Sequence, residues 1–243
     1  MLKNLNARYK ILMGIKKELL FSLEKEIICA IAYGSTMCED FYSESDFDVL
    51  LFLRNAELEN LFKLREIKLK FADQNINVDF NVHSENDLPK LRKECFWHNN
   101  RALYFQKEIT LYGLVLIGKN PFTENNNDAN EFRKESVRVI NSLLYQARKL
   151  FINRELTKKE KINLMKWCIY AVLYALSFKG ILPKTKKEAL QVFGKHYSIE
   201  IDPMLFLEAK VNNNVTDDLV QKAYKFLSKL DIIVFEEYGN GRK

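Results

Sequence analysis

Two hydrophobic periods alternate along the first half of the chain, one typical of helices and one typical of strands. Helical spacing of the apolar positions predicts helices over residues 5–24, 57–74 and 86–106. Compact apolar runs or strict alternation of polar and apolar side chains predict strands over residues 27–33, 46–53, 77–83 and 109–117. Strands that alternate with helices in this way indicate an α/β half with a mixed sheet.

The second half of the chain has helical spacing throughout, after a polar linker at residues 118–130 that contains a proline and a run of asparagines. Helices are predicted over residues 131–153, 158–179, 184–196 and 216–236. These segments indicate a small helical bundle. The prediction for the whole chain is an α+β protein, with an N-terminal α/β domain of residues 1–120 and a helical domain of residues 121–243.

The composition excludes several classes of protein. Hydrophobic residues make up 47% and charged residues 29% of the 243 residues, as in globular rather than disordered or fibrous proteins. The net charge of +6 is spread along the chain, which suits an anionic ligand but lacks the clustered basic stripe of a nucleic-acid binder. The longest near-apolar run, residues 167–178, is too short to span a bilayer and indicates a buried helix. The four cysteines form no close pair, so we expect a soluble, cytoplasmic protein with reduced thiols.

The stretch AYGSTMCEDFYSESDFDVLLFL, residues 32–53, contains the residues with the clearest chemical meaning. Gly34 and Ser35 directly follow a strand, where glycine permits a tight turn. A helix beginning after Ser35 would point its free N–H groups at a phosphate. Asp46 and Asp48 open the next strand and, being two positions apart, face the same side of it. Converging carboxylates beside such a turn are hard oxygen ligands suited to Mg²⁺.

The order Gly-Ser, short helix, then Ser-Asp-x-Asp at the head of an apolar strand resembles the signature of the DNA polymerase β-like nucleotidyltransferase superfamily. The resemblance implies that Asp46 and Asp48 bind one or two Mg²⁺ ions. The superfamily also uses a third carboxylate from a neighbouring strand. Asp79, on the polar face of the strand at residues 77–83, matches that position. By the same resemblance, Asp79 would be a metal ligand or the general base toward the attacking hydroxyl.

The resemblance also implies which residues contact the nucleotide. Within the superfamily, an α/β half followed by a helical bundle is most similar to the aminoglycoside and related antibiotic nucleotidyltransferases. The segment KGILPKTKKEAL is similar to a Pro-Lys-x-x-Ala stretch of the streptomycin-type adenylyltransferases, whose lysine contacts nucleotide phosphates. Lys184 is the matching position, and its alternative is a solvated lysine in a basic run. The implied nucleotide-binding residues are Gly34, Ser35, Ser45 and Lys184.

The function implied by the resemblance is Mg²⁺-dependent transfer of a nucleoside monophosphate from an NTP to a hydroxyl of a small acceptor. ATP is the expected donor, and an aminoglycoside-like antibiotic is one candidate acceptor. The acidic residues of the second half form no cluster that would mark a pocket for a cationic antibiotic. Two alternatives stay open: a protein-directed AMP transferase of the toxin–antitoxin type, and a non-catalytic nucleotide-binding module. The sequence leaves the oligomeric state open as well.

Overall fold

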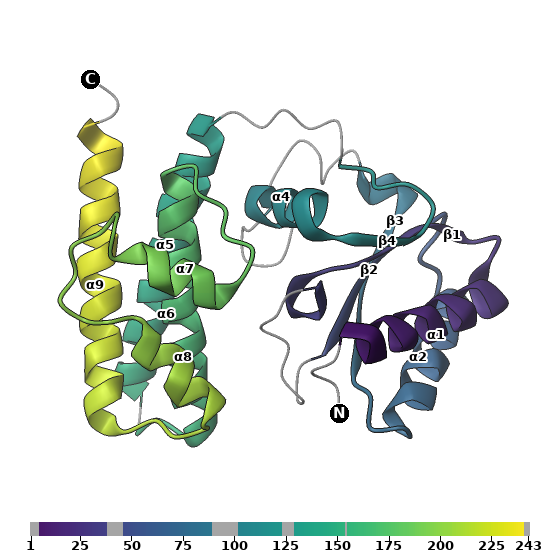
Figure 1. Cartoon of the computed structure of the whole chain (residues 1–243), viewed down its shortest axis with the longest axis horizontal. Helices are drawn as coiled ribbons and strands as arrows, with labels where there is room; N and C mark the ends of the chain where they lie inside the picture. Colours follow the sequence, from purple (N-terminus) through teal and green to yellow (C-terminus); the bar gives the residue numbers. More distant parts are fainter. Residues whose placement is uncertain (1–4, 38–45, 89–101, 123–128, 154, 241–243) are drawn as a thin grey trace. The chain divides into compact units, whose positions relative to one another are not determined.

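The computed structural model describes residues 5–37, 46–88, 102–122, 129–153 and 155–240 (Figure 1). The chain divides into two compact units. Residues 1–97 and 105–126 belong to the first unit, and residues 98–104 and 127–243 belong to the second. The division therefore falls within one helix, α4 (Ala102–Tyr112).

A mixed sheet lies in the first unit, and four strands make it up in the part of the chain that the structure describes. The strands are β1 (Ile27–Ala32), β2 (Phe47–Leu53), β3 (Val78–Ser84) and β4 (Leu114–Ile117). Their order is β3-β2-β1-β4. Strand β1 pairs antiparallel with β2 and β4, whereas β2 pairs parallel with β3. The predicted α+β class with a mixed sheet is confirmed.

Helices α1 (Leu5–Leu23) and α2 (Leu58–Ala72) cover one face of this sheet (Figure 1). The apolar residues of each helix recur at helical spacing, so each helix presents one continuous stripe to the sheet. Burying one such side chain contributes roughly 1.5–3 kcal/mol. The resulting apolar layer contains, from the helices and the strands, Leu12, Ile15, Leu19, Leu23, Leu64, Ile67, Phe71, Ala30, Ala32, Phe47, Val49, Leu51 and Val78.

The prediction of a strand over residues 109–117 was wrong in its first part, because α4 continues to Tyr112 and only Leu114–Ile117 form β4. The Gly113 N–H donates to Ile109 O at 3.0 Å and closes the helix. A Cβ at position 113 would lie 2.5 Å from the same carbonyl oxygen, so this turn requires glycine. The mixed apolar and β-branched residues before Gly113 fit either element, and burial of Ile109 on the helix decided between them.

The predicted helix over residues 86–106 falls mostly outside the described residues. Its described ends belong to a 3₁₀ helix, η2 (Glu85–Asp87), and to the start of α4. The N-terminus of α4 is capped by a side chain of the second unit, to which residues 98–104 also belong. The two carboxylate oxygens of Glu135 accept hydrogen bonds from the N–H groups of Leu103 and Tyr104, at 2.9 and 3.0 Å.

The second unit is helical, as predicted from the spacing of its apolar residues. Its remaining described helices are α5 (Ala129–Asn153), α6 (Lys158–Phe178), α7 (Lys186–Phe193), α8 (Met204–Val211) and α9 (Asp217–Asn240). Helix α8 was not predicted. It opens with four consecutive apolar residues, 204–207, which show no helical period. Its start is marked by Asp202, whose Oδ1 accepts a hydrogen bond from the Met204 N–H at 2.9 Å.

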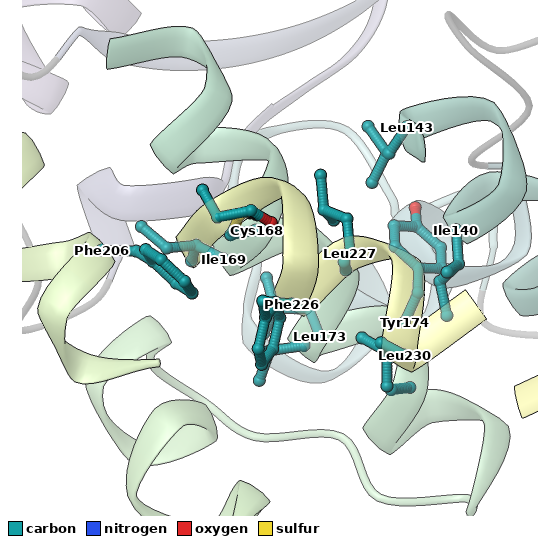
Figure 2. Packing of buried hydrophobic residues seen from close by; sticks show 14 of the residues in the cluster. Ile140, Leu143, Cys168, Ile169, Leu173, Tyr174, Phe206, Phe226, Leu227 and Leu230 are labelled. Atoms are coloured by element: carbon teal, nitrogen blue, oxygen red, sulfur yellow. Dashed lines mark hydrogen bonds between the residues drawn. The ribbon is translucent and has the colours of Figure 1, made fainter. Parts of the chain in front are cut away.

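Helix α6 lies at the centre of this unit. Its second half is buried on nearly all sides, as expected of a core helix, which confirms the interpretation of the apolar run at residues 167–178. Figure 2 shows side chains of α6 surrounded by those of α5, α8 and α9. The residues labelled there are Ile140, Leu143, Cys168, Ile169, Leu173, Tyr174, Phe206, Phe226, Leu227 and Leu230.

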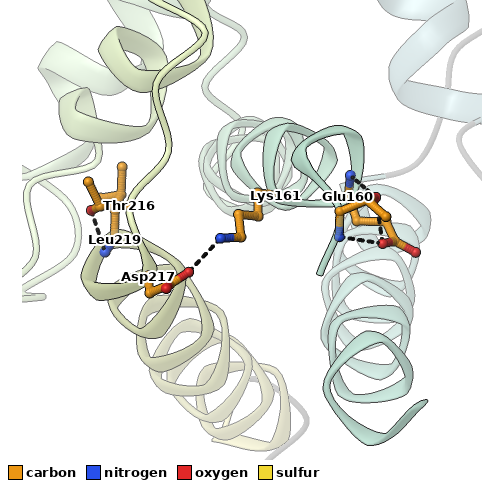
Figure 3. A network of polar contacts seen from close by, with 6 residues as sticks. Glu160, Lys161, Thr216, Asp217 and Leu219 are labelled. Carbon is orange, nitrogen blue, oxygen red and sulfur yellow. Dashed lines mark hydrogen bonds and ion pairs between the residues drawn. The ribbon is translucent and has the colours of Figure 1, made fainter. Parts of the chain in front are cut away.

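Polar contacts fix the first turns of α6 and α9 (Figure 3). Thr157 and Glu160 form a capping box, with the Thr157 N–H donating to Glu160 Oε2 at 2.8 Å and the Glu160 N–H donating to Thr157 Oγ1 at 3.3 Å. Lys161, one residue later, forms an ion pair with Asp217 at the start of α9. Among the described residues, no helix combines the length and the apolar character needed to cross a membrane.

Candidate active site

One row of side chains crosses the sheet at the edge where β1 ends and β2 and β3 begin. Asp48 of β2 and Asp79 of β3 are register partners, and partners on neighbouring strands point to the same face. Tyr33, directly after β1, continues the row, because its N–H donates to Asp48 O at 3.1 Å. The adjacent residues of each strand point into the apolar layer of α1 and α2, so the row faces the other way. Two of the predicted carboxylates therefore lie side by side.

Asp46 lies one step further toward the start of the strands, opposite Asn77. The Phe47 N–H donates to Asn77 O at 2.8 Å and extends the ladder by one residue. The Asn77 side-chain amide donates to Asp46 Oδ1, which fixes the orientation of that carboxylate. Because alternate residues of an extended strand share a face, Asp46 and Asp48 point in the same direction.

The Gly-Ser turn packs against this row of carboxylates. The turn is a 3₁₀ helix, η1 (Gly34–Met37), which begins at Gly34 rather than after Ser35 as predicted. Gly34 has a φ of +66°, a region that favours glycine. A Cβ at this position would lie 2.9 Å from Asp48 Oδ2, so the backbone of the turn approaches that carboxylate closely. Ser35 is half-buried within the turn, and Ser45 lies outside the described residues.

Thr36 joins the turn to the carboxylate strand. Its side chain is buried, and its Oγ1 accepts a hydrogen bond from the Asp48 N–H at 3.1 Å and donates to Asp46 O at 3.3 Å. The backbone on both sides of Phe47 is thus held by one hydroxyl. Thr36 could not be recognised from the sequence, because a threonine in a turn has no distinctive chemistry. Its place directly after Gly-Ser was the only available signal.

Asp79 is the most accessible of the three carboxylates, because β3 is the edge strand of the described sheet. Lys68 of α2 reaches it, with Nζ 3.6 Å from Asp79 Oδ1. The two side chains are 45% and 57% exposed, and an ion pair this open to solvent contributes about 0–1 kcal/mol. Asp79 therefore stays available to a ligand or to an approaching hydroxyl.

Tyr33 is a further residue of this row that was missed from the sequence, and the charges of Asp48 and Asp79 act on its hydroxyl. Burial raises the pKa of Tyr33 above its ordinary value of 10.0, and the negative charges of Asp48 and Asp79 raise it further. A hydrogen bond from Asn81 acts in the opposite direction. The ring packs edge-on against Phe105, with centroids 4.8 Å apart. The phenol is therefore a protonated donor at neutral pH.

The chemistry of these donors suits a hard divalent cation. Mg²⁺ prefers carboxylate oxygens, and it commonly takes one or two of them and completes its shell with water and substrate phosphates. No group of three or more His, Cys, Asp and Glu side chains forms a metal site by itself in the part of the chain that the structure describes. Asp46 and Asp48 point in the same direction and could supply two carboxylate ligands to Mg²⁺, with phosphate and water as the remaining ligands.

Comparison with known proteins connects this geometry to one enzyme fold. No family model and no curated protein is similar enough in sequence to match the chain. Among solved structures, the chain is similar to the spectinomycin adenyltransferase AAD(9) from Enterococcus faecialis, determined with ATP and spectinomycin. The TM-score is 0.62 over 92% of this chain and 98% of that one, at 13% sequence identity. At this identity the likeness shows that the two proteins share a fold.

The structural similarity covers residues of both compact units, and the predicted site residues are divided between these units. The carboxylates and the Gly-Ser turn belong to the first unit, whereas Lys184 belongs to the second. Lys184 is exposed and directly precedes Thr185, the N-cap of α7. Its N–H donates to Glu188 Oε2 at 2.9 Å, which fixes the backbone at this position. The structure thus brings together the first-unit residues Gly34, Asp46, Asp48 and Asp79.

Proposed function

We propose that this chain is a Mg²⁺-dependent nucleotidyltransferase that transfers AMP from ATP to a hydroxyl of a small acceptor. The observation that carries the proposal is the placement of Asp48 between Asp79 on the next strand and the glycine turn at Gly34. Carboxylates for a metal and a turn whose backbone can approach phosphate therefore meet at one edge of the sheet. The adenyltransferase fold supports this use of the edge.

Nucleotidyl transfer depends mainly on positioning and on stabilising charge. In this proposal the η1 turn holds the triphosphate through the backbone of Gly34 and Ser35, with Ser45 and Lys184 as further phosphate contacts. Asp46 and Asp48 hold the metal, which polarises the α-phosphate when bound. Asn77 keeps Asp46 oriented, and the hydrogen bonds of Thr36 keep both aspartates in register with the turn.

Asp79 is proposed to act on the acceptor. Its exposure at the edge strand lets an acceptor hydroxyl reach its oxygens, and a carboxylate there can accept the hydroxyl proton as the oxygen attacks the α-phosphate. Asp79 is alternatively a third ligand of the metal.

We propose an aminoglycoside-like antibiotic as the first acceptor class to test, with antibiotic resistance as the biological role. The support is the structurally similar enzyme, which is a spectinomycin adenyltransferase determined with ATP and spectinomycin. At 13% identity that enzyme's acceptor does not transfer directly to this chain. The panel therefore includes spectinomycin, streptomycin-type and other aminoglycosides, lincosamides and simple polyols.

The proposed function is tested by pyrophosphate release from each of the four NTPs with Mg²⁺ and each acceptor. We expect pyrophosphate release that depends on ATP and on one acceptor. In the double variant Asp46→Asn/Asp48→Asn this release should fall by about 10³-fold or more, because the metal that stabilises the charge of the transition state is no longer held. Asp73→Asn, which changes an aspartate at the end of α2, is the matched control and should release pyrophosphate like the wild type.

Each outcome separates this proposal from its alternatives. Transfer of AMP to a protein and not to any small molecule would favour a protein-directed AMP transferase. ATP binding that raises the melting temperature, without transfer to any acceptor tested, would favour a non-catalytic nucleotide-binding module. Absence of both binding and transfer would refute the proposed function.

A further inference from the structure

A buried arginine lies on the apolar stripe of α1. Arg8, Leu12, Ile15, Leu19 and Leu23 follow one another at helical spacing, and each is at most 4% exposed. Four of these residues pack into the apolar layer against the sheet, and an apolar side chain at the first position would continue the stripe. Burying a charged group is unfavourable unless the group is hydrogen-bonded. The presence of arginine here therefore points to a role other than packing.

One partner of Arg8 lies in the turn at the candidate active site. Arg8 Nη1 donates a hydrogen bond to Thr36 O at 3.1 Å, and this contact is buried. The side chain of the same threonine bonds the backbone of Asp46 and Asp48. One residue thus connects α1, the η1 turn and the start of β2. A displacement of the turn would move the backbone facing the phosphates relative to the carboxylates facing the metal.

We propose that Arg8 and Thr36 form a positioning link that holds the η1 turn in register with Asp46 and Asp48. The inference rests on the proposed function, because it assigns the link a role in joint binding of ATP and Mg²⁺. The phosphates would contact the turn and the metal would contact β2. Because each element holds a different part of the same substrate complex, the link couples the affinity for ATP to the presence of Mg²⁺.

The first test of the link needs no activity and no nucleotide. In Arg8→Met, the amide hydrogen of Asp48 and the amides of the η1 turn should exchange with solvent at least about tenfold faster than in the wild type, because the turn opens more often. Arg54→Met is the matched control. Arg54 also donates to a backbone carbonyl of this unit, Lys25 O at 3.0 Å, but at the far end of β2.

The second test measures ATP affinity by calorimetry with and without Mg²⁺. In Arg8→Met and in Thr36→Val, the gain in ATP affinity that Mg²⁺ provides should fall by about tenfold, whereas Thr36→Ser, which keeps the hydroxyl, should restore most of it. The double variant should lose little more than either single variant, since both changes break one link. Arg54→Met should retain the full gain.

The outcomes distinguish the link from the proposed function. A wild type that gains ATP affinity with Mg²⁺, together with an Arg8→Met variant that gains as much and exchanges at the same rate, overturns the link and leaves the function standing. A wild type without Mg²⁺-dependent ATP binding overturns the proposed function and the positioning role together. If Arg8→Met does not fold, Thr36→Val decides the question, because it removes a single hydroxyl and keeps the side-chain volume.

Discussion

At the scale of single residues, Gly34 is the position where a small change should have the largest effect. Its φ of +66° and the 2.9 Å distance from a Cβ to Asp48 Oδ2 make any larger residue both strained and crowded. We expect Gly34→Ala to destabilise the fold by about 1–3 kcal/mol and to weaken Mg-ATP binding further by displacing the carboxylate. Chemical denaturation and calorimetry would measure the two effects separately.

Gly194 provides the control for that substitution. It has a φ of −62° at the end of α7, and a Cβ added there meets no atom within 4 Å. Gly194→Ala should be neutral or stabilise by about 0.4–1 kcal/mol, since alanine restricts the unfolded chain. Equal effects of the two substitutions would show that Gly34 has no special role.

The raised pKa of Tyr33 leads us to expect that the stability of the fold decreases at alkaline pH. Its pKa in the folded state lies above the ordinary value of 10.0, so the folded protein binds more protons than the unfolded chain once the pH exceeds about 10. Its contribution to stability is therefore complete below pH 10 and is lost as the pH rises toward the folded pKa. Tyr33→Phe should flatten the fall in melting temperature between pH 9.5 and 11.5. An unchanged slope would place the Tyr33 hydroxyl in solvent.

The same residues show which parts of the candidate site could be predicted from the sequence. Spacing and strand alternation in the sequence could predict four of these residues, because they determine which side chains share a face. The four are Gly34, Asp46, Asp48 and Asp79. The role of Thr36 could not be predicted from the sequence, because it consists of two hydrogen bonds to backbone groups ten and twelve residues away. Contacts of that kind follow from the folded geometry of the turn and not from a period.

At the scale of elements, apolar patterning predicted most of the fold: compact apolar runs indicated β1 and β2, alternation indicated β3, and helical spacing indicated the long helices. It failed for short or interrupted elements. Helix α8 opens with consecutive apolar residues and shows no helical period, and the boundary between α4 and β4 depends on the single glycine at position 113. In both cases the deciding signal was a local hydrogen bond at a helix end.

The first turn of α4 is capped by Glu135 of α5, so a change of this side chain should lower the free energy of unfolding. Glu135 is buried, and both of its oxygens accept N–H groups of this turn. In Glu135→Gln, one of the two N–H groups faces an amide donor in place of an acceptor, and the charge that favours a helix N-terminus is lost. We expect a loss of about 1–3 kcal/mol, measured by urea denaturation.

Glu131, one turn earlier in α5, is the matched control for that loss. It is exposed and pairs with Lys134 on the same helix, so Glu131→Gln should change the free energy of unfolding by about 0.5 kcal/mol or less. If Glu135→Gln were as mild as Glu131→Gln, the N-terminus of α4 would not depend on this carboxylate.

At the scale of the whole molecule, the two compact units contain different parts of the proposed site. The carboxylates and the glycine turn belong to the first unit, and Lys184 belongs to the second. The similarity to the solved structure covers residues of both units, and we propose that both units are required for nucleotide binding. On this view, a nucleotide should protect amides of both units from hydrogen exchange, whereas a module that binds ATP with the first unit alone would show protection only there.

Lys184 tests this proposal at one position. An ammonium group that contacts phosphate stabilises bound ATP as a charge, so Lys184→Ala should raise the KM for ATP by about tenfold with a smaller change in kcat, as expected when binding is lost equally from ground and transition states. The loss should shrink at high salt, where the interaction of the wild type is screened. Lys187→Ala, in the same basic run, controls for the general positive charge and should leave KM within about twofold. Equal changes in the two variants would mean that Lys184 acts only through the charge of the run, and that the nucleotide is bound without a specific contact from the helical unit.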